Sequence, residues 1–268
     1  MKPLHYTLAD AHQWAAFSGD YNPVHFDLPW VQAQGGSQLS VHGMRALLDV
    51  KRYAGELFAA QNAPQSDYLK CVVRLRRPLW CDTDWLLVPD APKKRLAATA
   101  RVLCPDTREE CLSCQISPQD WPDTPQGSQR TDISADMLLK LQQSFSVLAP
   151  GAALWQLLDA LLFRQLIHDE ALLRQENIAA LLPQGAALQD VFSRYPVLQT
   201  HQELVFDSRL ARRWQETMLP EALELQLLPS LVVGDIHNGA LIRITAAARL
   251  NEQYLTNAIT LKVGPVAH

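Results

Sequence analysis

The sequence predicts an α+β fold made of two similar halves, each with one principal helix covered by an antiparallel sheet. Three observations carry this prediction: each half has one long helical segment, strand-like runs follow it, and a segment rich in Pro, Gly, Ser and Asp separates the halves. That segment, WPDTPQGSQRTD at residues 121–132, has the composition of a linker. We therefore expect one domain over residues 1–120 and a second over residues 133–268.

The first half begins with a short helix, expected over residues 8–17. A longer helix is expected over residues 42–60, because apolar residues recur there at roughly helical spacing: Met44, Leu47, Leu48, Ala54 and Phe58. Four alternating runs then predict strands: YLKCVVRLRR, DWLLVPD, RLAATARVLC and EECLSCQIS, at residues 68–77, 84–90, 95–104 and 109–117. Pro-Asp-Thr at residues 105–107 favours a hairpin between the last two runs.

The second half repeats this order of elements. The segment ALWQLLDALLFRQLI, which begins at Ala153, is apolar on nearly every side, so we expect a buried helix. Strand-like runs follow: THQELVFDSRLA, LELQLLPSLVV, ALIRITAAARL and YLTNAITLKV. The pair Asn238-Gly239 predicts a hairpin, since a type I′ turn needs positive φ at both central positions. Sequence identity between the halves is too weak to prove a repeat, but the order of elements supports one.

The overall composition argues against several classes of function. The 268 residues are 48% hydrophobic and 19% charged with a net charge of -4, so neither disorder nor general attraction to nucleic acid is expected. The N-terminus has no signal-peptide pattern. The longest apolar region is interrupted by Gln156, Asp159, Arg164 and Gln165, so it is not expected to span a bilayer. We expect a cytoplasmic protein without nucleic-acid or membrane partners.

The five cysteines do not predict a disulfide framework, because their number is odd and no secretory context accompanies them. Cys111 and Cys114 form a CxxC motif, a spacing found in zinc and redox sites. A second pair at ligand spacing is missing, and the segment EECLSCQIS has the pattern of a strand. We expect these thiols to pack on a sheet, and we expect no metal.

Chemistry-bearing residues gather in the stretch FSGDYNPVHFD, which begins at Phe17. Asp20 and His25 are separated by Asn22-Pro23, a dipeptide that favours a turn. A turn there can bring a carboxylate and an imidazole to the same side, and such a pair suits general acid–base catalysis. The spacing by itself also fits a plain structured turn.

A second feature, SVHGM at residues 40–44, stands at the start of the longer helix. A glycine that opens a helix leaves backbone N–H groups unpaired and lets a ligand approach closely. Gly43 is therefore a candidate donor to a carbonyl oxygen that gains negative charge during a reaction. The alternative is that Gly43 only allows tight packing of the helix.

Together, SGDYNPVHFD and VHGM resemble the signature of the MaoC-like, or R-specific enoyl-CoA hydratase, group of hotdog-fold proteins. The later segment LKCVVRLRRPLWCDTD is similar to the strand that follows the central helix in this group, and the resemblance covers about residues 5–117. It implies a double hotdog, in which the second half is a degenerate partner without the motif and the chain has one active site. The helix around residues 155–166 is then expected to line the acyl pocket.

The resemblance also implies an activity, the interconversion of trans-2-enoyl and (R)-3-hydroxyacyl thioesters of coenzyme A or acyl carrier protein, without a further cofactor. Asp20 and His25 would activate water, the Gly43 N–H would hold the thioester oxygen, Asn22 would shape the loop and His42 would orient the helix start. A hotdog thioesterase and a non-catalytic acyl-binding or scaffold protein are the alternatives. A homodimer is one assembly that we consider.

Residues 70–95 carry seven basic side chains against three acidic ones. Arg74, Arg76 and Arg77 lie in this stretch and are candidates for contact with coenzyme A phosphates or an acidic carrier protein. The alternative is a solvated strand face, which Arg74 and Arg76 would share. In the second half we expect structural roles for the polar residues that stand out: His201, Asp235 and His237.

Overall fold

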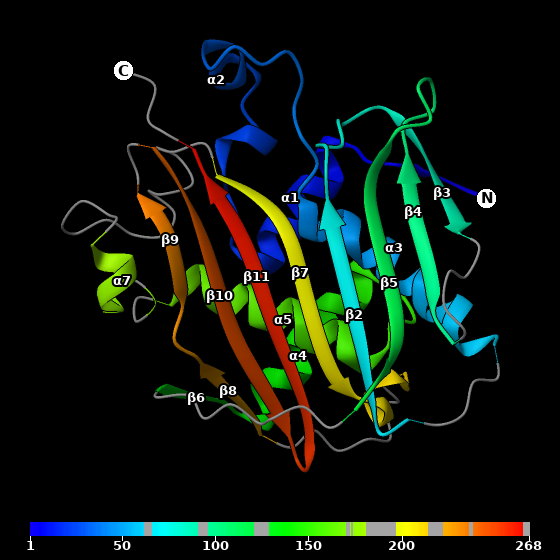
Figure 1. Ribbon diagram of the computed structural model, residues 1–268, viewed down its shortest axis with the longest axis vertical. Helices are drawn as coiled ribbons and strands as arrows, with labels where there is room; N and C mark the ends of the chain where they lie inside the picture. The colour runs from blue at the N-terminus through cyan, green and yellow to red at the C-terminus, as the bar shows by residue number, and fades with distance from the viewer. Residues whose placement is uncertain are drawn as a thin grey trace.

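The computed structural model describes residues 1–61, 66–90, 96–120, 129–169, 172, 174–180, 197–213, 222–235 and 238–264. The described strands form one antiparallel sheet of 11 strands, and the long helices lie together against one of its faces (Figure 1). Within these residues, no helix has both the length and the apolar character that crossing a bilayer requires.

The first half contains β1 (Lys2–His5), α1 (Leu8–Ser18), the 3-10 turn η1 (Pro23–His25), α2 (Leu28–Ala33), α3 (Gly43–Ala59), β2 (Tyr68–Leu75), β3 (Asp84–Asp90), β4 (Ala98–Leu103) and β5 (Glu110–Gln119). The second half contains β6 (Gln129–Ile133), α4 (Ala135–Leu148), α5 (Leu154–His168), α7 (Glu176–Ala179), β7 (Val197–Asp207), η2 (Ser208–Ala211), β8 (Leu223–Leu227), β9 (Leu231–Asp235), β10 (Gly239–Leu250) and β11 (Gln253–Val263).

The strand order is mirrored about the centre of the sheet. It runs β1-β3-β4-β5-β2 in the first half and β7-β11-β10-β8-β6 in the second, with β9 as an additional partner of β10. Central strands β2 and β7 pair antiparallel, from Tyr68 opposite Asp207 to Arg74 opposite His201. Each half is a helix, α3 or α5, covered by its own antiparallel strands, so the fold is the expected double hotdog.

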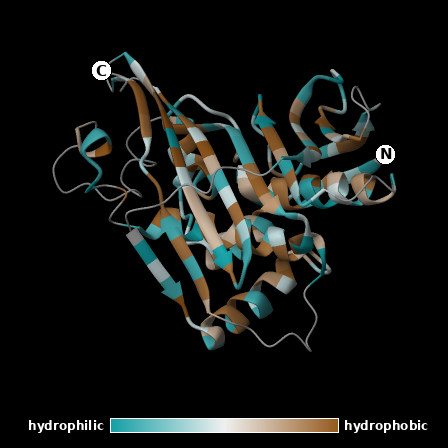
Figure 2. Cartoon of the chain, turned by 60° about the horizontal axis from the view of Figure 1, so that its bottom comes forward, coloured by the Kyte–Doolittle hydropathy of each residue, from teal (hydrophilic) through white to brown (hydrophobic). Residues whose placement is uncertain are grey.

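Burial follows the alternation of the strands and the apolar character of the helices. In β4 every second side chain is buried, and hydrophobic and hydrophilic residues alternate along the long strands (Figure 2). Helix α5 buries most of its side chains, as its sequence predicts, because it lies between the sheet and the other helices (Figure 1). The principal helices and the main strands therefore agree with the sequence prediction.

Two elements at the start of the second half differ from the sequence expectation. Residues 129–132, assigned to the linker from their polar composition, form most of β6, which pairs with β8 at the edge of the sheet. Edge strands tolerate polar residues, so composition does not distinguish this strand from a linker. Helix α4 was not expected; Ser134 caps it by accepting a hydrogen bond from the Met137 N–H, and among its residues Leu138 and Phe145 are buried.

Three details of the other strands also differ from the sequence expectation. The run LELQLLPSLVV forms two strands, β8 and β9, because Pro229 has no N–H for a continuous ladder. Residues 208–211 form η2 and do not extend β7. The hairpin between β9 and β10 is confirmed, but Gly239 pairs with Asp235, so the connection does not centre on Asn238-Gly239.

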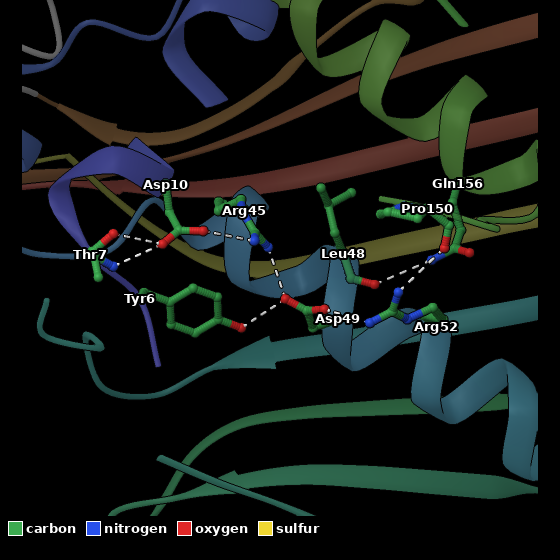
Figure 3. Close-up of polar contacts among 9 residues, drawn as sticks. All are labelled: Tyr6, Thr7, Asp10, Arg45, Leu48, Asp49, Arg52, Pro150 and Gln156. Carbon is green, nitrogen blue, oxygen red and sulfur yellow. Dashed lines mark hydrogen bonds and ion pairs between the residues drawn. The ribbon is translucent and has the colours of Figure 1, made fainter. Parts of the chain in front are cut away.

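Helix α3 is held in place by polar contacts on its outer side (Figure 3). Arg45 donates hydrogen bonds to Asp10 of α1 and to Asp49, and the Tyr6 hydroxyl also donates to Asp49. Toward the second half, Gln156 of α5 donates to the Leu48 carbonyl. These contacts fix the N-terminal end of α3 relative to α1, whose C-terminus leads into the FSGDYNPVH loop.

A fully buried polar cluster lies between α3 and α5. Lys51 of α3 forms an ion pair with Asp159 of α5 and donates to Gln202 Oε1 at 2.6 Å. Asp159 Oδ1 also accepts hydrogen bonds from Gln202 Nε2 at 2.7 Å and from Asn257 Nδ2 at 2.8 Å. Burial raises the pKa of Asp159, while the Lys51 ammonium and the Gln202 amide act in the opposite direction. Lys51 comes from the first half and its partners from the second, so the cluster joins the two.

We expect Lys51→Met to lower the free energy of unfolding by about 3–5 kcal/mol, because it leaves the Asp159 carboxylate buried without its counter-charge. The double variant Lys51→Met/Asp159→Leu should recover most of this loss, since it removes both charges. Urea denaturation of the single and double variants measures the coupling. Lys70→Met, which breaks the partly exposed Lys70–Glu203 pair, is the control and should cost less than about 1 kcal/mol. Equal small losses at both positions would contradict a dominant role for the buried cluster.

Candidate active site

The FSGDYNPVH loop begins where α1 ends. Gly19 caps α1 with a φ of 81°, a conformation that favours glycine, and its N–H donates to the Ala15 carbonyl. Asn22 then caps η1 by accepting a hydrogen bond from the Val24 N–H at 3.2 Å. The Asn22 N–H in turn lies 3.3 Å from Asp20 Oδ1. The loop is thus a turn held by hydrogen bonds, in which Asn22 links the Asp20 carboxylate to the start of η1.

His25 follows at the end of η1, and its ring is held in one orientation. Its Nδ1 lies 2.7 Å from the Ser40 carbonyl oxygen and 3.2 Å from the Ser40 hydroxyl. Because a carbonyl oxygen only accepts hydrogen bonds, Nδ1 carries the proton in the neutral ring. The lone pair of Nε2 is then free to take a proton from a ligand or a water molecule.

His42 supports this arrangement from the start of α3. Its ring stacks on the His25 ring with centroids 3.7 Å apart, and its Nε2–H donates to the Asp20 carbonyl at 3.0 Å. Burial, followed by the proximity of His25, lowers the pKa of His42 to about 2, so this ring stays neutral. Its buried Nδ1 has no hydrogen-bond partner among the described residues. His42 therefore joins the loop to the helix start, which is the place that the sequence prediction gives it.

Burial changes the acidity of Asp20 and His25 in opposite directions. It raises the pKa of Asp20 above the ordinary value of 3.8, while His25 and the Asn22 N–H act to lower it. It lowers the pKa of His25 below the ordinary value of 6.5, while Asp20 and the Ser40 carbonyl act to raise it. At neutral pH, His25 is consequently uncharged and able to act as a base.

Gly43 is the first residue of α3, which points its N-terminal end at the same site. A methyl group built on Gly43 would lie 2.9 Å from Leu75 Cδ2 and 3.6 Å from Gln199 Oε1. The closer contact is the end of the flexible Leu75 side chain, which can move aside, so packing gives only a weak reason for a glycine at this position. The helix N-terminus supplies the partial positive charge that a carbonyl oxygen would meet.

Asp20, His25 and Gly43 line one cavity of about 260 Å³. The second half supplies the facing wall, to which Phe163 of α5 contributes as the sequence prediction of a pocket-lining helix expects. Most of the lining is apolar: Val24, Val41, Met44, Ala46, Leu75, Leu79, Leu112, Phe163, Val197, Leu198 and Leu261. Sequence reasoning did not identify Gln199 and Thr200 of β7, two polar lining residues. The cavity thus combines an acid–base pair with an apolar compartment built by both halves.

The arginines of the predicted basic patch do not all lie together. Arg76 and Arg77 line the cavity, and both are exposed and paired with acidic residues of the β4–β5 region, Glu110 and Glu109. Arg74 is exposed opposite His201 and does not line the cavity.

Acidic residues outside positions 70–95 reduce the positive charge expected from that stretch. Glu109 and Glu110 form ion pairs with Arg77 and Arg76, and Glu203 forms one with Lys70. The basic residues at positions 93–95 lie outside the described residues. The count of charges along the sequence therefore overstates the local positive charge.

His201 and Asp235, two of the polar residues of the second half that stood out in the sequence, do not line the cavity. His201 is exposed and contacts the Thr200 hydroxyl. Asp235 accepts hydrogen bonds from Asn238 in the β9–β10 hairpin. His237 lies outside the described residues.

The described residues include one cluster with metal-ligand chemistry, and it is this same site. Atoms of Asp20, His25 and His42 that can bind metal lie within 4.8 Å of one another. The His42 Nε2 and His25 Nδ1 atoms are already hydrogen-bonded to backbone carbonyls. The CxxC cysteines, Cys111 and Cys114, are buried on β5, and Cys114 Sγ lies 3.5 Å from Cys71 Sγ. The absence of a metal, which we expect from the sequence, stays a prediction.

No family model matches the sequence, and no curated protein matches it. Solved structures do match. A MaoC-like dehydratase is 11% identical with a TM-score of 0.46, over 98% of this chain and 95% of that chain. An (R)-hydratase from A. caviae involved in PHA biosynthesis is 20% identical with a TM-score of 0.33, over 44% of this chain and 92% of that chain. An acyl-CoA thioesterase II from Mycobacterium marinum is 12% identical with a TM-score of 0.40, over 86% and 93% of the two chains.

These likenesses concern the fold, since identity is low in every case. The loop motif and the helix start carry the more specific resemblance, because they bring Asp20, His25 and Gly43 to one cavity. In its double hotdog fold and in the signature of this loop, the chain is similar to the MaoC-like hotdog proteins.

Proposed function

We propose that the chain interconverts trans-2-enoyl and (R)-3-hydroxyacyl thioesters by adding or removing water. One observation carries the proposal: a half-buried carboxylate, a buried neutral imidazole and a helix N-terminus line the same cavity, most of whose lining is apolar. Water addition to an enoyl thioester needs a base for water, a proton for the α-carbon and a donor for the thioester oxygen. Asp20, His25 and Gly43 offer these three functions.

In the hydration direction, a water molecule held between Asp20 and His25 attacks the β-carbon. Its proton passes to His25 Nε2, whose lone pair is free because Nδ1–H is bonded to the Ser40 carbonyl. As the β-carbon to oxygen bond forms, the double bond becomes an enolate, and the α-carbon then takes a proton from the acid–base pair. The Gly43 N–H stabilises the negative charge on the thioester oxygen. Dehydration follows the same steps in reverse.

The carrier of the acyl group is coenzyme A or acyl carrier protein, and it would meet Arg76 and Arg77. Both guanidinium groups line the cavity and are exposed, so they can reach a phosphate in solvent. The apolar wall formed by Phe163, Val197 and Leu261 would hold the acyl chain. No cofactor beyond the thioester carrier enters this mechanism.

A thioesterase is the second candidate, because the cavity also holds an amide and a hydroxyl from β7, Gln199 and Thr200. With Asp20 they provide polar groups that can hold water near a thioester carbonyl. A non-catalytic acyl-binding or scaffold protein is the third candidate, from another class. Crotonyl-CoA distinguishes all three, since hydration removes the enoyl absorbance without releasing thiol, hydrolysis releases thiol, and binding alone does neither.

We expect Asp20→Asn and His25→Gln each to lower kcat for crotonyl-CoA hydration by about 10²–10⁴-fold, because each removes one acid–base group. The loss of enoyl absorbance measures the rate, and a thiol reagent measures hydrolysis. The matched controls are Asp84→Asn and His5→Gln, which change an exposed pair whose atoms lie 2.8 Å apart. Both controls should retain wild-type rates. Thiol release by the wild type, or full activity of Asp20→Asn, would contradict the proposal.

The pH dependence of kcat/KM should show an acid limb below pH 6.5, the ordinary pKa of the His25 imidazole. The lowered pKa of His25 keeps its ring neutral below pH 6.5, and the raised pKa of Asp20 lets its carboxylate take a proton above pH 3.8. Activity should therefore stay constant as the pH falls from 7 to 6.5 and decline at lower pH. Initial rates with crotonyl-CoA, in buffers of constant ionic strength, give the profile. An acid limb centred above pH 6.5 would contradict the assignment of the base.

Arg77→Ala should raise KM for crotonyl-CoA by about five-fold with little change in kcat, since an exposed phosphate contact is worth about 1 kcal/mol. Glu109→Gln should have the opposite effect on KM, because it frees the Arg77 guanidinium from its ion pair. Steady-state kinetics at low and high salt measure both effects, which should shrink as salt rises. Arg249→Ala, an exposed arginine of β10 outside the cavity, is the control. An unchanged KM in Arg77→Ala would remove Arg77 from the carrier site.

A further inference from the structure

Strand β7 contains an irregularity at the edge of the cavity. It pairs with β11 in a register that shifts between Thr260 and Leu261, where Thr260 lies opposite His201 and Leu261 opposite Gln199. Thr200 is therefore an extra residue in β7, as in a β-bulge. Such bulges reverse the faces of a strand, because side chains alternate with a period of two residues.

The bulge changes which side chains of β7 turn toward the interior beside α3. After it, Gln202, Leu204 and Phe206 point inward and are buried. Uninterrupted alternation would also turn Leu198 inward and Gln199 outward. With the bulge, Gln199 is half-buried against Gly43, whereas Leu198 is 61% exposed. The irregularity thus turns the Gln199 amide toward the start of α3, while Leu198, which also lines the cavity, stays largely exposed.

The amide of Gln199 lies beside the helix start and is poorly satisfied. Its Oε1 is 3.6 Å from a methyl group built on Gly43, and its Nε2 donates to Met44 Sδ at 3.8 Å. A thioether is a weak acceptor, so this hydrogen bond is easily exchanged for one to a carbonyl oxygen. Rotation of the amide about the Cγ–Cδ bond exchanges the positions of its oxygen and nitrogen, so the N–H can face either Met44 or Gly43.

We propose that Gln199 is a second donor to the thioester oxygen, acting together with the Gly43 N–H. This inference rests on the proposed function and adds to it a residue from the half that lacks the loop motif. When the enolate forms, the Gln199 N–H leaves Met44 Sδ and donates to the oxygen that gains negative charge. The two protein donors then stabilise that charge together. No covalent bond to Gln199 forms or breaks.

The first test separates a donor from a packing residue. Gln199→Met keeps the length and volume of the side chain but removes the amide, and Gln199→Glu keeps the shape but replaces the donor with a negative charge. Both should lower kcat for crotonyl-CoA hydration by about 10²–10³-fold with KM changed much less, since the contact strengthens as charge develops. Gln226→Met, on β8 and outside the cavity, is the matched control and should retain wild-type kcat.

The second test does not depend on turnover. Butyryl-CoA labelled with ¹³C at its carbonyl carbon has no double bond to hydrate, and its infrared carbonyl band moves to lower frequency when donors polarise it. We expect a shift on binding to the wild type that decreases in Gln199→Met and stays unchanged in Gln226→Met. Thermal unfolding of both variants checks that the fold is retained.

The outcomes distinguish the two proposals. Wild-type hydration with equal kcat and an equal carbonyl shift in Gln199→Met would overturn the role of Gln199 and leave the proposed function intact. A shift that depends on Gln199, without hydration of crotonyl-CoA, would support the donor and overturn the hydratase. Failure of butyryl-CoA to bind the wild type would overturn both.

Discussion

The antiparallel pairing of β2 with β7 is the contact on which the rest of the structure depends. Because each half has the same strand order, this pairing joins the two sheets edge to edge and sets α3 beside α5 on one face (Figure 1). The Lys51–Asp159 ion pair then forms in the interior between the helices. A shift of one residue between β2 and β7 would separate these charges, so the buried pair and the strand register specify the same arrangement of the halves.

The sequence predicts those parts of the fold and the site that depend on interactions between residues close together in the chain. A glycine at a helix start, an Asn-Pro turn and helical apolar spacing each act within a few residues, so α3 and the loop could be predicted from the sequence. The proximity of Asp20, His25 and Gly43 is predicted from the resemblance to the MaoC-like proteins, and all three line one cavity. The double hotdog follows from the repeated order of helix and strands. In these segments the local sequence preference and the long-range packing favour the same structure.

The parts that the sequence did not reveal depend on contacts between distant segments. Lys51 has the character of a solvent-facing residue in a helix, and only α5 and β7 make its burial favourable. Simple alternation along β7 would turn Gln199 outward, and only the bulge at Thr200 reverses the orientation of its side chain. Strand β6 has a polar sequence that fits a linker or an edge strand equally well, and its pairing with β8 decides between these states.

The two halves contribute different parts of one site. The first brings the ionisable pair, and the second adds apolar lining from α5, β7 and β11 to the same cavity. Burial raises the pKa of Asp20 and lowers the pKa of His25, which moves each pKa from its ordinary value toward that of the other group. A proton moves between groups at the smallest energetic cost when their acidities are similar. In the proposed hydratase, the half without the motif would act on the chemistry through the apolar lining that it adds to the cavity, and this gives a physical reason for a second hotdog domain beside the proposed catalytic loop.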